Sequence, residues 1–138
     1  MAEISPQRRR LVATRANFCC EYCLIHDDDT FLGCQVDHIV SRKHGGADDD
    51  GNLAFACAFC NRHKGSDLGS LTVGGELIRF FNPRTERWVD HFRLVGALIE
   101  PLTNTGEVTA RILEFNSHDQ MAERALLIRQ RRYPPRRI

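Results

Sequence analysis

The feature that most constrains the fold of this chain is a pair of C-x-x-C motifs. Cys20 and Cys23 form the first motif, Cys57 and Cys60 form the second, and 33 residues separate Cys23 from Cys57. Each motif presents two thiols on one tight turn, and two such turns suit a tetrahedral zinc ion. A redox-active dithiol and chance clustering are the alternatives. We therefore expect these four cysteines to bind a structural Zn²⁺ that joins two distant parts of the chain.

Two further cysteines leave a choice of ligand open. Cys19 could replace Cys20, because C-x-x-x-C is also a possible turn, but the spacing of Cys20 matches that of the second motif. Cys34 is interpreted as a small buried apolar residue. The first residues, MAEISPQRRR, lack the apolar stretch of a secretory signal. A cytoplasmic location is therefore expected, where a disulfide framework would be unusual.

The composition indicates a globular domain. Of the 138 residues, 42% are hydrophobic and 27% are charged, which argues against a disordered chain. The apolar run at residues 94–99 is far shorter than the roughly 20 residues that a membrane span needs. We expect a single domain over residues 1–138 with no membrane partner.

Charge is unevenly distributed along the chain. The net charge is only +1, which excludes a bulk polycation. Residues 19–67 hold nine acidic and four basic residues, a net charge of −5, so the rest of the chain carries +6. The basic ends could contact phosphates or form solvated surface. Their arginines are Arg8, Arg9, Arg10, Arg15, Arg129, Arg131, Arg132, Arg136 and Arg137.

Local signals predict an α+β fold. Residues 5–16 are typical of a basic helix, with Ser5 as N-cap and Pro6 at the first helical position. A strand is expected over 35–40, a loop over 41–52, a strand over 53–56, and a helix over 58–64 that ends at Gly65. The helix over 5–16 is expected to precede a core of about residues 17–70, which the other elements form.

Residues 71–138 are expected to support that core as an antiparallel β-layer and a helix. Gly74-Gly75 predicts a hairpin between strands 71–73 and 76–81. The apolar segments 88–92, 97–102 and 108–115 are interpreted as strands, with a turn at 104–106. Ser117 is the expected N-cap of a helix over 118–130.

Polar residues cluster between and after the two cysteine motifs. Asp37 and His38 follow one another in the predicted strand, Asn52 ends the loop, and Asn61 and Lys64 share one face of the predicted helix. Asp and Asn supply hard oxygen ligands for a Mg²⁺-like ion, and His is the natural general base near neutral pH. A cation, a base and a lysine together suit phosphodiester hydrolysis.

Taken in order, the segments CEYC, VDHIV, HGG, NL and CAFCNRHKG resemble the four-cysteine, zinc-stapled branch of the HNH endonuclease family. The resemblance covers about a third of the chain and is specific as a combined pattern. It implies a ββα-metal module, in which a hairpin and a helix hold one catalytic cation. It also implies that the protein hydrolyses DNA to 5′-phosphate and 3′-hydroxyl products.

The resemblance assigns a role to each matching residue. His38 corresponds to the general base, and Asp37 to a ligand of the catalytic cation, Mg²⁺ or Mn²⁺. Asn52 corresponds to the asparagine that holds the loop and positions the base. Asn61 corresponds to the second cation ligand, with His63 as the alternative. Lys64 would contact phosphate or act only as a charge at the helix C-terminus.

Neighbouring strand residues point to opposite faces. Asp37 and His38 can share one site only if the strand bulges or ends near His38, and we expect this. Arg42, His44 and Arg62 are candidate contacts to nucleic acid. The second Asp-His pair, Asp90-His91, lacks a following motif and is interpreted as the end of a strand.

Two other functions remain open at the level of sequence. The first is a catalytically inactive, zinc-stapled nucleic-acid-binding module, which would not need Asp37, His38 and both asparagines together. The second is an interaction domain without a nucleic-acid partner, consistent with the negative charge of residues 19–67. DNA is the expected partner, and no residue pattern indicates an oligomeric state.

Overall fold

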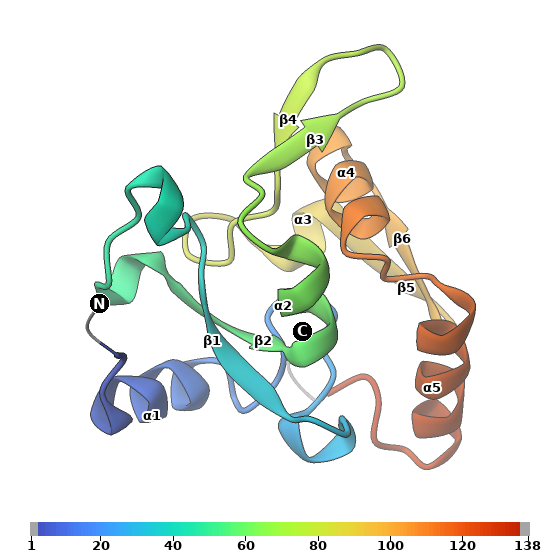
Figure 1. Ribbon diagram of the computed structural model, residues 1–138. Coiled ribbons are helices and arrows are strands. Elements are labelled where there is room, and N and C mark those ends of the chain that lie inside the picture. The colour runs from blue at the N-terminus through green and yellow to red at the C-terminus, as the bar shows by residue number, and fades with distance from the viewer. Residues whose placement is uncertain (1–2, 136–138) are drawn as a thin grey trace.

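The computed structural model describes residues 3–135, and its centre is an antiparallel hairpin with a helix on each face (Figure 1). Strands β1 (Cys34–His38) and β2 (Leu53–Cys57) pair so that Cys34 lies opposite Cys57 and His38 opposite Leu53. Helix α1 (Pro6–Arg15) packs on one face through Val12, and helix α2 (Ala58–Lys64) on the other. This arrangement confirms the α+β class.

The ends of both helices follow from local chemistry. The Ser5 hydroxyl accepts a hydrogen bond from the backbone N–H of Arg8, and Pro6 opens α1, as predicted. Gly65 ends α2 with a positive φ of 54°, which glycine adopts without strain. Short 3₁₀ turns, η1 (Asp27–Asp29), η2 (Arg42–His44) and η3 (Asp50–Asn52), shape the loops before and after β1.

Within the described residues that follow α2, the chain forms two further hairpins and three helices. Strands β3 (Gly69–Leu71) and β4 (Leu77–Arg79) form a hairpin that projects from the body at the top of Figure 1. The order continues with α3 (Trp88–His91), β5 (Phe92–Val95), β6 (Leu98–Pro101), α4 (Asn104–Ile112) and α5 (His118–Arg129).

The prediction of a strand is wrong for two segments of this region. Trp88–His91 is a short helix, and most of the segment 108–115 belongs to α4. The predicted turn at 104–106 is the first turn of α4, because the Thr103 hydroxyl accepts from the N–H of Gly106. A Cβ atom at Gly106 would lie 2.3 Å from the carbonyl oxygen of His91, so this glycine is required by close packing. The expected β-layer is therefore two separate hairpins with α4 packed against them.

One buried cluster runs from the first cysteine motif to the end of the described chain. It joins Cys20 and Tyr22 to Phe81, Leu113 and Tyr133. The Tyr133 hydroxyl donates a 2.8 Å hydrogen bond to the carbonyl oxygen of Cys23. The prediction of one domain over residues 1–138 stays a prediction. Within residues 3–135, no helix combines the length and hydropathy needed to cross a membrane.

Candidate functional site

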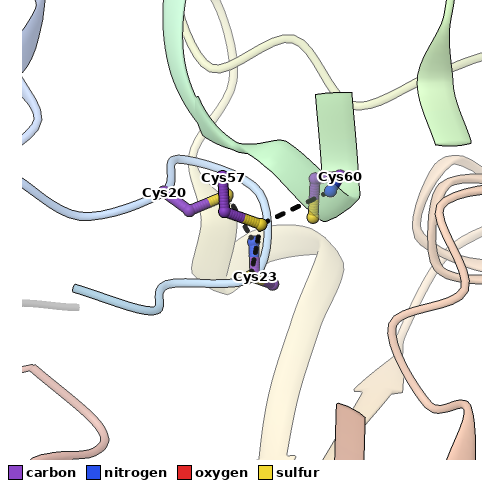
Figure 2. Close-up of side chains that lie close together, drawn as sticks. All are labelled: Cys20, Cys23, Cys57 and Cys60. Carbon is purple, nitrogen blue, oxygen red and sulfur yellow. Dashed lines mark hydrogen bonds between the residues drawn. The ribbon is translucent and has the colours of Figure 1, made fainter. Parts of the chain in front are cut away.

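Four cysteine side chains converge where the first motif meets the junction of β2 and α2 (Figure 2). The Sγ atoms of Cys20, Cys23, Cys57 and Cys60 lie within 4.8 Å of one another, and all four residues are buried. Cys23 Sγ and Cys57 Sγ are 3.8 Å apart. Zn–S bonds of about 2.3 Å in a tetrahedron place sulfurs about 3.8 Å apart. The cluster therefore has the donors and the size to hold a structural metal such as zinc.

In each motif, a backbone amide donates a hydrogen bond to one cysteine sulfur. The N–H of Cys23 donates to Cys20 Sγ, and the N–H of Cys60 donates to Cys57 Sγ, both at 3.4 Å. Hydrogen bonds from the thiols of Cys20, Cys23 and Cys60 lower the pKa of Cys57, despite its burial. The hydrogen bonds among the thiols raise the pKa of Cys23 and Cys60, so this environment favours the thiolate, the metal-binding form, at Cys57 but not at those two residues.

The two remaining cysteines lie outside the cluster. Cys19 is buried, its Sγ donates to the carbonyl oxygen of Asn17 at 3.4 Å, and burial raises its pKa to about 11. Cys34 is half-buried in β1, and burial also raises its pKa. Cys20, and not Cys19, therefore belongs to the quartet.

Strand β1 ends where the sequence predicted, at His38, which is the last residue paired with β2, opposite Leu53. The next N–H, that of Ile39, donates to the carbonyl oxygen of Asn52. The Asn52 side chain accepts from the N–H of Val40 and donates to the carbonyl oxygens of Val40 and Ala47, each at 2.8 Å. The predicted strand end and a loop held by Asn52 are confirmed.

Asp37 points into the interior between β1 and α2 and is only 4% exposed. Its Oδ2 accepts a 3.0 Å hydrogen bond from the Tyr22 hydroxyl and lies 3.2 Å from Lys64 Nζ. Lys64 is 2% exposed and also donates to the carbonyl oxygen of His38. Burial raises the pKa of Asp37, and the Lys64 ammonium opposes that shift. The lysine is thus a buried ion-pair partner rather than a solvent-exposed charge at the helix end.

His38 pairs with an acidic residue of the following loop. Its Nε2 lies 2.7 Å from Asp48 Oδ1, which also accepts from Arg42 Nε at 2.8 Å. These hydrogen bonds, that of Arg42 most, lower the pKa of Asp48. An ionised carboxylate can only accept hydrogen bonds, so Nε2 carries a proton, and in a neutral imidazole Nδ1 is then the nitrogen with the lone pair. The geometry thus leaves Nδ1 as the basic nitrogen.

Two arginines of α1 bind the loop between β1 and β2 that carries Asp48. Arg8 binds the carbonyl oxygen of Asp48 and pairs with the Asp50 carboxylate at 3.1 Å. Arg15 donates to the carbonyl oxygens of Asp50 and Leu53. These two arginines, for which the sequence left phosphate contact and solvated surface open, therefore bind the protein itself. Arg136 and Arg137 lie outside the described residues.

The polar residues of α2 point in different directions. Asn61 Nδ2 donates to Gln35 Oε1 at 2.6 Å, and Gln35 shares a β1 face with Asp37. His63 instead contacts the carbonyl oxygen of Phe59 through Nδ1 and Glu114 through Nε2, each at 2.9 Å. Asn61 is thus on the Asp37 side of the helix, while both ring nitrogens of His63 are engaged elsewhere.

The other predicted site residues are dispersed. His44 is exposed on η2, Arg62 is exposed on α2, and Arg42 binds Asp48. Asp90 and His91 lie on α3, where the His91 ring contacts Glu86 and Thr103, so their interpretation as the end of a strand is wrong.

Sequence reasoning missed Tyr22, Gln35 and Asp48. Tyr22 lies between the cysteines of the first motif, where no spacing rule marks it as a partner of Asp37. Asp48 begins an acidic run that is typical of a solvated loop. Only the fold brings each of these side chains to its partner.

Comparison with known proteins agrees with this geometry. The family model of the HNH endonucleases matches residues 20–67, the segment that holds both cysteine motifs, β1, β2 and α2. No curated protein and no solved structure matches the chain. The resemblance to HNH endonucleases is confirmed for this segment, which indicates a nuclease or nucleic-acid-binding function.

We predict that Cys20→Ser lowers the zinc content of the purified protein and destabilises it, because loss of one thiolate weakens metal binding that is coupled to folding. Cys19→Ser is the matched control and should retain one zinc per chain and the wild-type thermal unfolding midpoint. Metal analysis and thermal unfolding measure both properties. Equal zinc content and stability in the two variants would contradict the assignment of the quartet.

Replacing Lys64 tests the buried ion pair. Lys64→Met leaves Asp37 buried without its cation and should cost about 3–5 kcal/mol in the free energy of unfolding. The exposed Lys43→Met should cost about 0.5 kcal/mol or less. The double variant Lys64→Met/Asp37→Asn should recover part of the loss. Denaturant unfolding of zinc-loaded protein gives these values, and equal stabilities of Lys64→Met and Lys43→Met would rule out the pair.

Proposed function

We propose that this protein is a divalent-cation-dependent endonuclease that hydrolyses phosphodiester bonds in DNA. The observation that carries the proposal is the setting of His38: the strand ends there, Asn52 holds the loop, and Nε2 lies at hydrogen-bond distance from the Asp48 carboxylate. A neutral imidazole with a fixed tautomer is the form that a general base needs.

In this proposal, His38 Nδ1 takes a proton from the attacking water. Asp48 holds the ring in orientation and stabilises the imidazolium that forms, as a carboxylate does behind other catalytic histidines. Attack occurs in line with the leaving 3′ oxygen, and the products carry a 5′-phosphate and a 3′-hydroxyl. Asp48 is therefore a positioning residue, and His38 is the catalytic base.

Asp37 and Asn61 are the proposed ligands of the catalytic cation. A carboxylate and an amide carbonyl are hard oxygen donors, which suit Mg²⁺ or Mn²⁺. When bound, such a cation supplies charge stabilisation at the phosphate and at the leaving oxygen. Lys64 now contacts the Asp37 carboxylate, so one oxygen must be released from this pair. His63 is the weaker candidate, because both of its ring nitrogens have partners.

One observation favours a second function, that of an inactive zinc-stapled module that only binds nucleic acid. Asp37 is buried, and its carboxylate already contacts both Tyr22 and Lys64. If that pair never opens, the site has no carboxylate for a cation. Cleavage assays separate the two functions.

His38→Ala should lower the rate of supercoiled-plasmid cleavage about 100- to 10,000-fold, because the general base is lost. The assay compares zinc-loaded wild type and variant with added Mg²⁺ or Mn²⁺, and with neither. His118→Ala is the matched control, since that histidine is 96% exposed on α5, and it should cleave at the wild-type rate. Cleavage by His38→Ala at the wild-type rate would refute the assigned base.

Asp48→Asn should lower kcat about 10- to 100-fold with little change in KM, because an amide no longer fixes the His38 tautomer. Asp49→Asn, one residue along the same exposed loop, should leave kcat unchanged. Steady-state cleavage of a labelled oligonucleotide duplex measures both constants. A loss confined to KM would show that Asp48 acts in substrate binding instead.

A further inference from the structure

A groove of about 450 Å³ opens directly beside Asn61. Its walls come from the loop before β1, from the first turns of α2, and from α5. Both aromatic and polar side chains line it, among them Phe31, Gln35, Phe59, Asn61, Arg62 and Glu123. The groove is continuous with the candidate cation site through Asn61.

The aromatic lining is unusual because one ring is left entirely in water. Phe31 is 100% exposed, and its neighbour Leu32 is 69% exposed. A single exposed apolar residue is ordinary on a protein surface. Here, however, two adjacent ones border a groove that also contains Phe59. Free aromatic faces beside a polar groove are the means by which proteins stack unpaired nucleobases.

The charged residues that line the groove predict how a nucleotide would be oriented in it. Arg62 is an exposed cation on α2 and would attract a phosphate, whereas Glu123 on the α5 wall would repel one. A nucleotide would therefore place its backbone along α2 and its base toward Phe31 and α5. Asn61 Nδ2 donates to Gln35 Oε1, which leaves Asn61 Oδ1 for the proposed cation and Gln35 Nε2 to donate to a sugar or a base edge.

We propose that this groove binds one unpaired nucleotide next to the phosphodiester at Asn61, with its base stacked on Phe31. The groove volume is within the range of about 300–1,000 Å³ that accommodates small-molecule ligands. The substrate class is accordingly single-stranded DNA, or duplex DNA with an unpaired base at the cleavage point, and this specificity rests on the proposed nuclease function.

The test measures binding separately from cleavage. Zinc-loaded His38→Ala protein, without added Mg²⁺, is titrated into dye-labelled single-stranded DNA, a fully paired duplex, and a duplex with one unpaired base. Adding Phe31→Ala should weaken binding to the two DNAs with unpaired bases about tenfold, the loss expected for one stacked base. Phe31→Tyr should restore binding. Phe18→Ala, at a phenylalanine that is 45% exposed and does not line the groove, should bind as the His38→Ala parent does.

The outcomes separate the two proposals. A tenfold loss in Phe31→Ala that is confined to DNA with unpaired bases supports the groove, even if the wild type cleaves no substrate. If Phe31→Ala binds all three DNAs as tightly as its parent, the groove proposal is overturned, even if plasmid cleavage depends on His38. Equal losses on all three DNAs would also overturn it. A fully paired duplex has no unpaired base to stack on Phe31, so loss of that ring should not weaken its binding.

Discussion

The convergence of four thiols at one point is the constraint on which the rest of the structure depends. It joins residues 20–23 to residues 57–60, so that β1, the Asn52 loop and β2 lie within one closed segment. Closing such a segment removes conformational freedom from the unfolded chain and fixes the relative position of its two ends. His38 and Asp37 therefore owe their placement to side chains that take no part in the proposed chemistry.

The uneven charge distribution is explained by pairing across the fold. The acidic segment 19–67 receives arginines from outside it: Arg8 pairs with Asp50, Arg84 with Glu21, and Arg132 with Asp29. Within the segment, Lys64 and Arg42 pair with Asp37 and Asp48. The three arginines from outside the segment thus offset part of its net charge of −5, which reduces the repulsion that a phosphodiester would otherwise meet.

Local signals predicted much of the core, because they act between near neighbours in the chain. Ser5 marks the start of α1, Gly65 marks the end of α2, and the cysteine spacing predicts the metal cluster. Helix α4 was missed because its first turn has the composition of a loop, and its helical state depends on packing against β3, β4 and β6. The partner of His38 was missed for a similar reason, since only the folded loop brings Asp48 to the ring.

The hydrogen bond between Tyr133 and Cys23 has a consequence for fragment design. It spans 110 positions and connects the last described segment to the turn of the first cysteine motif. A fragment cut to the family-matched residues 20–67 would leave that carbonyl without its protein donor and would expose the faces that pack on Phe81, Leu113 and Tyr133. We therefore expect a fragment of residues 20–67 to be less stable than one that extends through residue 133.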